Sequence, residues 1–390
     1  MADAATISEI RSRYGMTRKE LADSLGLDAD GQRLVKSWET GEAELPSDIA
    51  TRLDAYPETP PFSQDESDPD AYDFTFIDLF AGIGGIRQAF QRHGGLCVWT
   101  SEIDSYAQKT YRANYGGEIV GDITKVDERE IPDFDIVLAG FPCQAFSMAG
   151  HRRGFDDARG TLFFDVARIV KEKRPKALFL ENVKNLMHHD KGRTIQVILG
   201  TLDELGYEVP APRVLDAYRF GIPQHRERTL IVGFRRDLLS GGAPEFEYPK
   251  GDPHPSCKVG DILQPEDEVA AKYTLKDGTW EYLQRHKERA RAKGNGFGFT
   301  TFTADSPRTN TISARYYKDG SEALVDRQDG QNPRRLTPRE CARLQGFPEE
   351  FVIPVSDARA YKQFGNSVCI PMIEAVAEAE LDYMRANGLL

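Results

Sequence analysis

The chain has 390 residues, 40% of them hydrophobic and 29% charged, which is ordinary for a globular protein of two or three domains. No apolar run approaches the roughly 20 residues that span a bilayer, and the N-terminus has no signal pattern, so we expect a cytoplasmic protein without a membrane segment. The net charge of −12 argues against a protein that simply coats nucleic acid, although residues 272–339 hold 14 Lys and Arg against 8 Asp and Glu. Five widely spaced cysteines without a Cys-x-x-Cys pair indicate neither a disulfide framework nor a zinc site, and we expect no metal.

Residues 1–55 are predicted to form a small helical module. Thr17 followed by Glu20 is a capping box that begins one helix, and a second helix is expected in "QRLVKSWETG" after a tight turn. Helix, turn and helix in this order resemble the helix-turn-helix of the Cro/repressor type. The side chains expected to contact operator DNA from the second helix are Gln32, Arg33 and Lys36. The alternative is a helical bundle without DNA contacts.

Residues 56–73 are rich in Pro, Asp, Glu and Ser and are predicted to be an acidic linker. From Phe74 onward, apolar strands alternate with amphipathic helices. Strands are expected at 74–80, 96–102, 134–141, 176–183 and 228–234, another before Asp122, and helices at 85–95, 161–175 and 193–207. Residues 74–240 are therefore predicted to be an α/β domain with a doubly wound, mostly parallel sheet.

Residues 241–332 are turn-rich, with short strands, glycines and basic residues, and are expected to form a smaller second domain. Helical order returns in residues 333–390, where Thr337, Pro338 and Glu340 carry the signature of a helix start. A clear amphipathic helix ends the chain. We therefore expect the α/β domain to be interrupted and then completed by the C-terminal segment.

The segment "DLFAGIGG" is a strand that runs into a glycine turn and a helix, where a ligand can approach backbone N–H groups. Glu102 ends the next strand, 20 residues after Gly82, an offset that suits a carboxylate on ribose hydroxyls. Asp122 follows the expected third strand and is assigned to an adenine amino group. These residues predict an adenosine-containing ligand but do not separate NAD from S-adenosylmethionine.

Cys143 follows a strand at the sheet edge where such folds bind ligands, and a long polar loop follows it like an active-site lid. The alternative for a lone cysteine is a small buried side chain. Glu181 ends another strand and is a candidate proton donor. Arg226 and Arg228 alternate at a strand start, so both are expected to project to the same side and clamp an anion, with surface ion pairs as the alternative.

Together these pieces closely resemble the bacterial DNA (cytosine-5) methyltransferases. The motifs "FIDLFAGIGG", "GFPCQAFS", "ENV", "QHRER", "RRLTPRECARLQGF" and "QFGNSV" occur in the order of that family, from about Phe74 to the C-terminal helix. The segments "KGNGFGF" and "SARYYKDGSE" look most like the Dcm/EcoRII and HpaII group. The resemblance implies the S-adenosylmethionine-dependent methyltransferase fold, with residues 241–332 as the target-recognition domain.

The resemblance also implies a role for each matched residue. Cys143 would be the nucleophile, Glu181 would contact N3 and N4 of the cytosine and Arg228 its O2, and Arg226 would orient Glu181. The implied S-adenosylmethionine site consists of Phe80, Gly82, Gly84, Glu102, Ile103, Asp122, Ile123, Pro142, Leu162, Asn366 and Ser367. The implied contacts with target DNA are Gln144, Ser147, Arg152 and Arg153 on the loop, and Thr311 and Arg315 beyond it.

The resemblance therefore implies an enzyme that transfers a methyl group from S-adenosylmethionine to C5 of a flipped-out cytosine in duplex DNA, acting as a monomer. Its site would be of the CC(N)GG or CCGG type, and the enzyme would belong to a restriction-modification system or act alone. A transcriptional regulator that uses the N-terminal module and an RNA cytosine-5 methyltransferase stay open as alternatives. An NAD oxidoreductase would leave Cys143, Glu181 and Arg228 unexplained.

Overall fold

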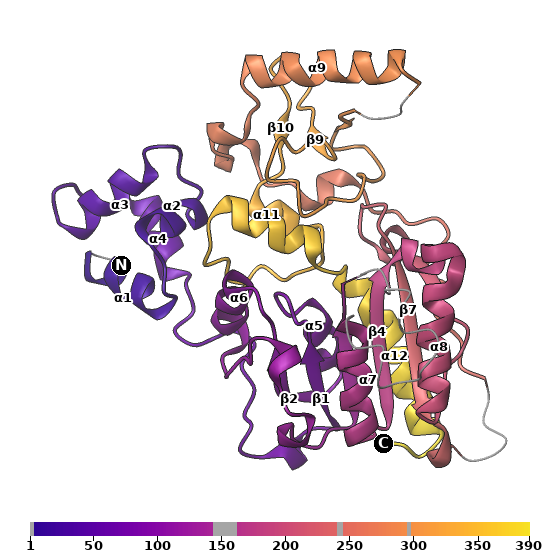
Figure 1. Cartoon of the computed structure of the whole chain (residues 1–390). Helices are drawn as coiled ribbons and strands as arrows, with labels where there is room; N and C mark the ends of the chain where they lie inside the picture. The colour runs from indigo at the N-terminus through magenta and orange to yellow at the C-terminus, as the bar shows by residue number, and fades with distance from the viewer. Residues whose placement is uncertain (1–3, 143–161, 240–244, 295–297) are drawn as a thin grey trace.

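The computed structural model describes residues 4–142, 162–239, 245–294 and 298–390. Figure 1 shows an N-terminal helical module beside an α/β part, and a smaller part that lies beyond the sheet. The module contains α1 (Ala4–Arg13), α2 (Arg18–Ser24), α3 (Gly31–Glu39) and α4 (Ser47–Asp54). The expected capping box is confirmed: the Thr17 hydroxyl accepts from the Glu20 N–H, and the Glu20 carboxylate accepts from the Thr17 N–H at 2.8 Å. Because a Cβ at Gly31 would lie 2.9 Å from the Cβ of Ala22 in α2, glycine lets α3 begin close against α2.

The central sheet has the strand order β2-β1-β3-β4-β7-β5, and β6 also pairs with β7. Its strands are β1 (Phe74–Leu79), β2 (Gly95–Ser101), β3 (Ile136–Gly140), β4 (Ala177–Val183), β5 (Tyr207–Glu208), β6 (Arg213–Asp216) and β7 (Glu227–Arg235). The first four strands run parallel, whereas β7 is antiparallel to β4 and to both β5 and β6. The predicted α/β fold with a parallel-rich sheet is confirmed. The strand expected before Asp122 is wrong, because Val120 forms only an isolated bridge with Ser101.

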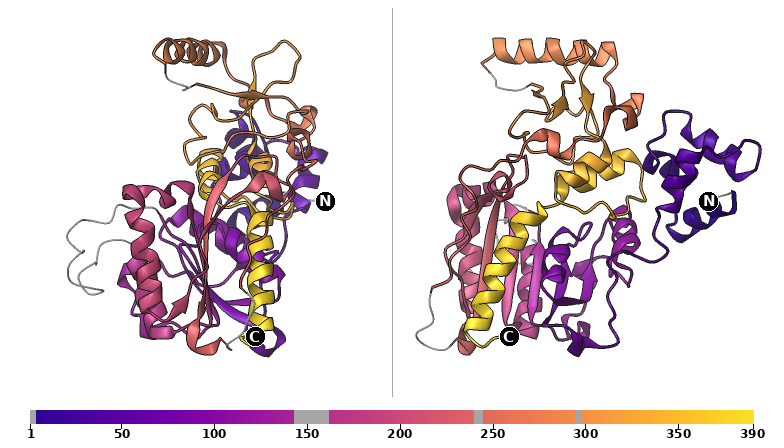
Figure 2. Two further views of the ribbon diagram at one scale, coloured as in Figure 1. Left: turned by 90° about the vertical axis from the view of Figure 1, so that its right-hand side faces the viewer. Right: turned by 180° about the vertical axis from the view of Figure 1, so that it is seen from behind.

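Alternate residues of the buried strands face two hydrophobic layers, which explains their continuous apolar character. Phe76, Leu138 and Phe179 belong to the layer that includes α5 (Gly85–Arg92) and α12 (Ile370–Ala386). Their neighbours Ile77 and Val137 belong to the layer under α7 (Leu162–Lys173) and α8 (Arg193–Glu204). Figure 2 shows α12 on one face of the sheet and α7 and α8 on the other. The C-terminal helix therefore completes the α/β part, as its amphipathic pattern indicates.

The remaining helices connect the parts. α6 (Ser105–Tyr115) follows β2, and α10 (Pro338–Arg343) begins at the predicted capping box of Thr337 with Glu340. α11 (Asp357–Asn366) leads toward α12. Within the described residues, no helix is long and apolar enough to cross a membrane.

The smaller part contains one long helix and a minimal sheet. The helix α9 (Asp277–Ala292) lies at the outer end, and β8 (Thr301–Phe302), β9 (Leu324–Val325) and β10 (Arg334–Arg335) form three short strands. The short strands match the expectation, whereas α9 was not expected. Only Leu283 and Ala290 of α9 are buried, so its sequence has no apolar stripe to reveal it.

Candidate active site

A cavity of about 640 Å³ opens where β1, β3 and β4 end. Its walls come from residues far apart in the chain: 80–83, 85–86, 102–104, 107, 140–142, 162, 181–183, 228, 311–314, 362–363 and 365–368. Parallel strands bring their carboxyl ends to one edge of the sheet, so this is the position where open α/β sheets bind ligands. The C-terminal segment and the smaller part close the other side.

The glycine turn after β1 forms one wall of the cavity. Phe80 and Gly82 have positive φ angles of 55° and 56°, and the Gly82 N–H donates to Glu102 Oε2 at 2.8 Å. A Cβ at Gly82 would meet nothing within 4 Å, so this residue faces open space. Gly84 has a different role, because a Cβ there would lie 2.3 Å from the Tyr115 ring. It permits packing of α6 and does not line the cavity.

Glu102 and its neighbours form the rim of the same wall. The second Glu102 oxygen accepts from the Asp104 N–H at 2.7 Å, and burial raises the pKa of the Glu102 carboxyl despite these N–H donors. Ile103 is 71% exposed, an unusual state for a large apolar side chain that lies beside a cavity. Asp104 caps the start of α6 and pairs with Lys362 at 2.8 Å. The rim thus combines a hydrogen-bond acceptor with an uncovered apolar surface.

The structure does not bring all of the predicted cofactor residues together. Phe80, Gly82, Glu102, Ile103, Pro142, Leu162, Asn366 and Ser367 line the cavity. Asp122 and Ile123 do not line it: Asp122 accepts from the Thr124 N–H and hydroxyl, and Ile123 is buried in the layer under α7. The Thr124 donors also lower the pKa of Asp122. One oxygen of Asp122 thus stabilises the local turn, and the residue lies outside the cavity lining.

Glu181 lines the cavity from β4, which β3 separates from the strand that leads into the glycine turn. It pairs in register with Gly140 of β3, and a Cβ at Gly140 would lie in ordinary contact with the carboxylate, 3.5 Å from Glu181 Oε2. Arg228 Nε lies 2.9 Å from Glu181 Oε1, and both side chains are almost completely buried. Burial raises the pKa of Glu181, although Arg228 and Arg226 oppose this shift. A buried carboxyl with a raised pKa is suited to hold or deliver a proton.

The expectation that Arg226 orients Glu181 is not what the contacts show, because Arg228 makes that ion pair. Arg226 is fully buried and donates to the backbone carbonyls of Ile312 and Gly365, each at 3.0 Å, and to that of Ser367. The prediction assumed a regular strand through both arginines, but β7 begins only at Glu227. Arg226 and Arg228 therefore face different surroundings.

The remaining predicted residues, those expected to contact the base or DNA, do not all lie together at the cavity. Thr311 lines the cavity, whereas Arg315 is exposed and does not. The predicted nucleophile and loop contacts, Cys143, Gln144, Ser147, Arg152 and Arg153, lie outside the described residues. Gln32, Arg33 and Lys36 are exposed on α3, remote from the cavity lining.

Five polar residues that line the cavity were given no role by the sequence analysis: Asp104, Asn182, Ser313, Lys362 and Gln363. Asn182 is buried and donates to the carbonyl of Phe141 at 2.7 Å, so it fixes the chain just before Pro142. Lys362 and Gln363 line the cavity from α11. Gln363 begins the "QFGNSV" motif and Lys362 precedes it, so this motif was the available signal for both. Among the described residues, no cluster of His, Cys, Asp or Glu is arranged to hold a metal ion.

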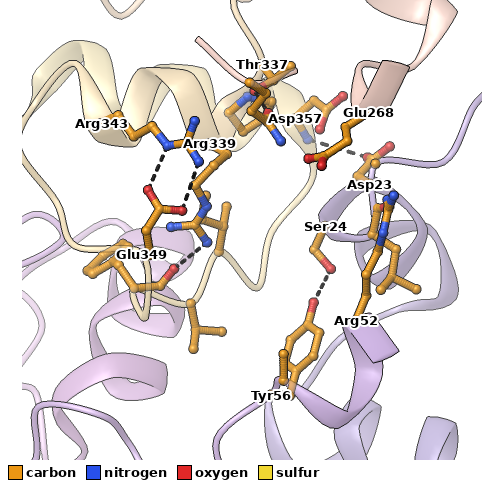
Figure 3. A pocket seen from close by; sticks show the side chains of 18 of the residues that line it. Asp23, Ser24, Arg52, Tyr56, Glu268, Thr337, Arg339, Arg343, Glu349 and Asp357 are labelled. Atoms are coloured by element: carbon orange, nitrogen blue, oxygen red, sulfur yellow. Dashed lines mark hydrogen bonds and ion pairs between the residues drawn. The ribbon is translucent and has the colours of Figure 1, made fainter. Parts of the chain in front are cut away.

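A second cavity, of about 420 Å³, lies between the N-terminal module, the start of the smaller part and the segment before α11 (Figure 3). Beside it, Lys272 pairs with Asp23 of α2 at 3.1 Å and with Asp357 of α11 at 3.0 Å; we call these three residues the junction. The arginines at this cavity are engaged, as Arg343 is with Glu349 at 2.7 Å. The Lys272–Asp23 pair of the junction therefore holds the module against the rest of the chain, while the cavity beside it stays open.

Comparison with known proteins gives a consistent result. The family model for C-5 cytosine-specific DNA methylase matches residues 74–381. The type II methyltransferase M1.ScrFI of Lactococcus lactis subsp. cremoris is 53% identical over 98% of this chain and 96% of its own length. The type II methyltransferase M.HpaII of Haemophilus parainfluenzae is 48% identical over 81% of this chain and 92% of its own. The solved structure of the Entamoeba histolytica methyltransferase EhMeth shares the fold, with a TM-score of 0.63 and 20% identity over 79% of this chain and 98% of that one.

Proposed function

The chain belongs to the C-5 cytosine-specific DNA methylase family, and on that premise we propose that it transfers a methyl group from S-adenosylmethionine to cytosine C5 within a specific duplex DNA sequence. One observation carries the proposal beyond family membership. A single cavity has the Gly82–Glu102 wall on one side and the buried Glu181–Arg228 pair on the other. A methyl donor and a base would thus meet inside it.

The first wall suits the adenosyl part of S-adenosylmethionine. The Glu102 carboxylate is an acceptor for ribose hydroxyls, and the exposed Ile103 offers apolar contact to an adenine ring. Pro142 and Leu162 would pack on the cofactor, and Asn366 with Ser367 would enclose its methionine end. When bound, S-adenosylmethionine supplies an electrophilic methyl group. Asp122 does not line the cavity, so we assign it no contact with the cofactor.

The second wall suits the chemistry that cytosine needs, because its C5 is a poor nucleophile. We propose that the Cys143 thiolate adds to C6, while Glu181 delivers a proton or hydrogen bond at N3 and Arg228 holds O2. This addition makes C5 nucleophilic enough to take the methyl group. A base, for which solvent water suffices, then takes the C5 proton; the electrons of that bond form the C5–C6 double bond as the C6–S bond breaks and the Cys143 thiolate leaves. Return of the N3 proton to Glu181 restores the aromatic ring. The raised pKa of Glu181 favours the protonated acid that this step uses.

The base must leave the DNA stack to reach such a cavity, at a cost of a few kcal/mol. We propose that residues 241–332 read the sequence, with Thr311 and Arg315 near the DNA, and that Gln144, Ser147, Arg152 and Arg153 act on the loop beside it. The named relatives are type II methyltransferases, and we extend that class to this chain. A short palindrome of the CC(N)GG or CCGG type is the proposed target.

A second function is proposed for the N-terminal module. Gln32, Arg33 and Lys36 are all exposed on α3, while α2 is held by Asp23 at the junction. This arrangement leaves α3 free to enter a DNA groove. Binding of operator DNA would add transcriptional regulation to catalysis. A gel shift with upstream DNA against random DNA tests it, and equal affinity for both would reject it.

Bisulfite sequencing of DNA from cells that express the chain tests the catalytic proposal. Cytosines within one short sequence should be protected from conversion, and this protection should vanish with Cys143→Ala. Methyl incorporation into purified duplex DNA and into tRNA, measured side by side, separates the RNA alternative. Absence of protection, or incorporation into tRNA alone, would overturn the proposal.

A further inference from the structure

Arg226 is buried, and no carboxylate of the described residues forms an ion pair with it. Its side chain is 0% exposed, and its guanidinium donates to three backbone carbonyls, those of Ile312, Gly365 and Ser367. Among the described residues, its Nε has no acceptor. Burial of a charged group costs free energy. The role of this guanidinium therefore lies in the segments whose carbonyls it binds.

Gln224 holds the same segment from its other edge. Its side-chain oxygen accepts from the Ile312 N–H at 3.1 Å, and its side-chain nitrogen donates to the Leu344 carbonyl at 3.0 Å. Both polar backbone groups of Ile312 are thus bound by side chains of the "QHRER" motif. The backbone adds to this, because the His225 N–H donates to the Thr309 carbonyl at 2.9 Å. The position of residue 312 is therefore fixed by residues 224–226.

The segment that is fixed forms part of the cavity wall. Thr311, Ile312, Ser313 and Ala314 all line the cavity, and the end of α11 lines it beside them. The two segments touch at Gly365, where a Cβ would lie 2.3 Å from the backbone carbonyl of Ser313. Arg226 spans the same contact, since it binds the carbonyls on both sides of it. The segment 311–314 belongs to the part proposed to read DNA, and 365–367 to the part proposed to hold the cofactor.

We propose that Arg226 is a positioning residue that joins the DNA-reading segment 311–314 to the cofactor-binding end of α11, and so sets the geometry of target and methyl donor. This inference rests on the proposed function. The competing view is that Arg226 acts by its charge on Glu181. A lysine distinguishes the two, because it keeps a charge but lacks the planar fork that reaches several carbonyls.

The experiment compares Arg226→Lys with Gly365→Ala. The second substitution disrupts the contact between Gly365 and Ser313 directly, whereas the first removes the side chain that spans it. Gly200→Ala is the matched control, because a Cβ at Gly200 in α8 meets nothing within 4 Å. Wild type and variants are assayed for kcat and KM on a duplex that contains the target sequence and on one with a single base changed. Thermal unfolding shows how much of each variant is folded, and the pH profile of kcat reports on Glu181.

Both test variants should lower kcat/KM for the target by about 10- to 100-fold, the range expected when reacting groups move by about 1 Å. They should also discriminate less against the changed base, while the alkaline limb of the pH profile stays in place. The double variant should be no worse than the stronger single variant, because both disrupt one contact. Gly200→Ala should match the wild type.

The inference is overturned if Arg226→Lys keeps wild-type kcat/KM and discrimination, if the two effects multiply, or if only the melting temperature falls. Should Arg226→Lys fail to fold, the same measurements on Gly365→Ala decide the matter. Failure of the proposed function would look different, since the wild-type chain itself would then transfer no methyl group to duplex DNA.

Discussion

Replacement of Glu181 by glutamine tests the proposed acid at the centre of the site. The amide keeps the size of the side chain and its polar contact with Arg228, which now lies 2.9 Å from the carboxylate, but it cannot deliver a proton. General acid catalysis contributes about 10²- to 10⁴-fold, so kcat should fall by about 10²-fold or more, or about 2.7 kcal/mol in barrier height. Because both side chains are almost completely buried, solvent cannot easily substitute for the lost acid.

The pH dependence of kcat provides a second way to test the role of Glu181. Burial raises the pKa of Glu181, and the protonated form is the proposed donor, so wild-type kcat should fall as pH rises through that raised value. Ionisation of the Cys143 thiol acts in the opposite direction and produces a rising limb. In Glu181→Gln the falling limb should disappear and the rising limb should remain.

The assay is transfer of labelled methyl groups to duplex DNA under saturating substrates, across about pH 5 to 9. Glu227→Gln is the control, because Glu227 lies next to Arg228 in the chain but pairs with Lys184, outside the cavity lining. It should stay close to the wild type. The reasoning fails if Glu181→Gln retains most of its kcat, or loses it without any change in the falling limb.

Three further outcomes follow from the packing. Glu380 is fully buried on α12, and both of its carboxylate oxygens lack a partner among the described residues. Because burial raises its pKa, the wild-type chain loses stability as the pH rises above the ordinary pKa of a glutamate. Glu380→Met should raise the free energy of unfolding by about 1–3 kcal/mol at neutral pH and by less at about pH 5; equal gains in urea titrations would contradict this. Gly84→Ala should mainly lower the melting temperature and Gly82→Ala mainly the affinity for S-adenosylhomocysteine by calorimetry, and the reverse pattern would be inconsistent with the structure. Lys272→Met should speed proteolytic release of the N-terminal module, unlike Lys19→Met, which removes only an exposed partner of Asp23; equal rates would show that the junction does not hold the module.

Much of the α/β part was predictable because its strands are buried on both faces and therefore read as continuous apolar runs. The strand expected at 176–183 is β4 at Ala177–Val183, and the one at 74–80 is β1 at Phe74–Leu79. Helices without an apolar stripe along one face were not predictable. α11 has the sequence "DARAYKQFGN", in which buried and exposed positions both carry polar side chains, such as the buried Gln363. Only the three-dimensional fold shows that α11 lines the cavity.

The site was predictable where position along a strand decides proximity, and unpredictable where a side chain has a choice of partners. Glu102 and Glu181 lie at the cavity because they end strands of one sheet edge. The sequence cannot say that Asp122 binds Thr124, or that Arg226 prefers carbonyls of distant segments to the nearby Glu181. The glycines of "AGIGG" likewise have separate roles that one motif conceals: Gly82 faces the cavity, whereas Gly85 makes room for Ser367, which would lie 2.9 Å from a Cβ there.

The N-terminal module contacts the very helices that form the cavity, so the two are mechanically connected. α6 begins at the rim beside Asp104 and carries Lys109, which pairs with Glu20 of α2 at 2.9 Å. α11 begins at the junction with Asp357 and ends at the cavity. Ala113 of α6 is also buried in the hydrophobic core of the module. Each of these two helices therefore contacts the module along one part and the cavity along another, so the position of the module and the shape of the cavity wall depend on the same two elements.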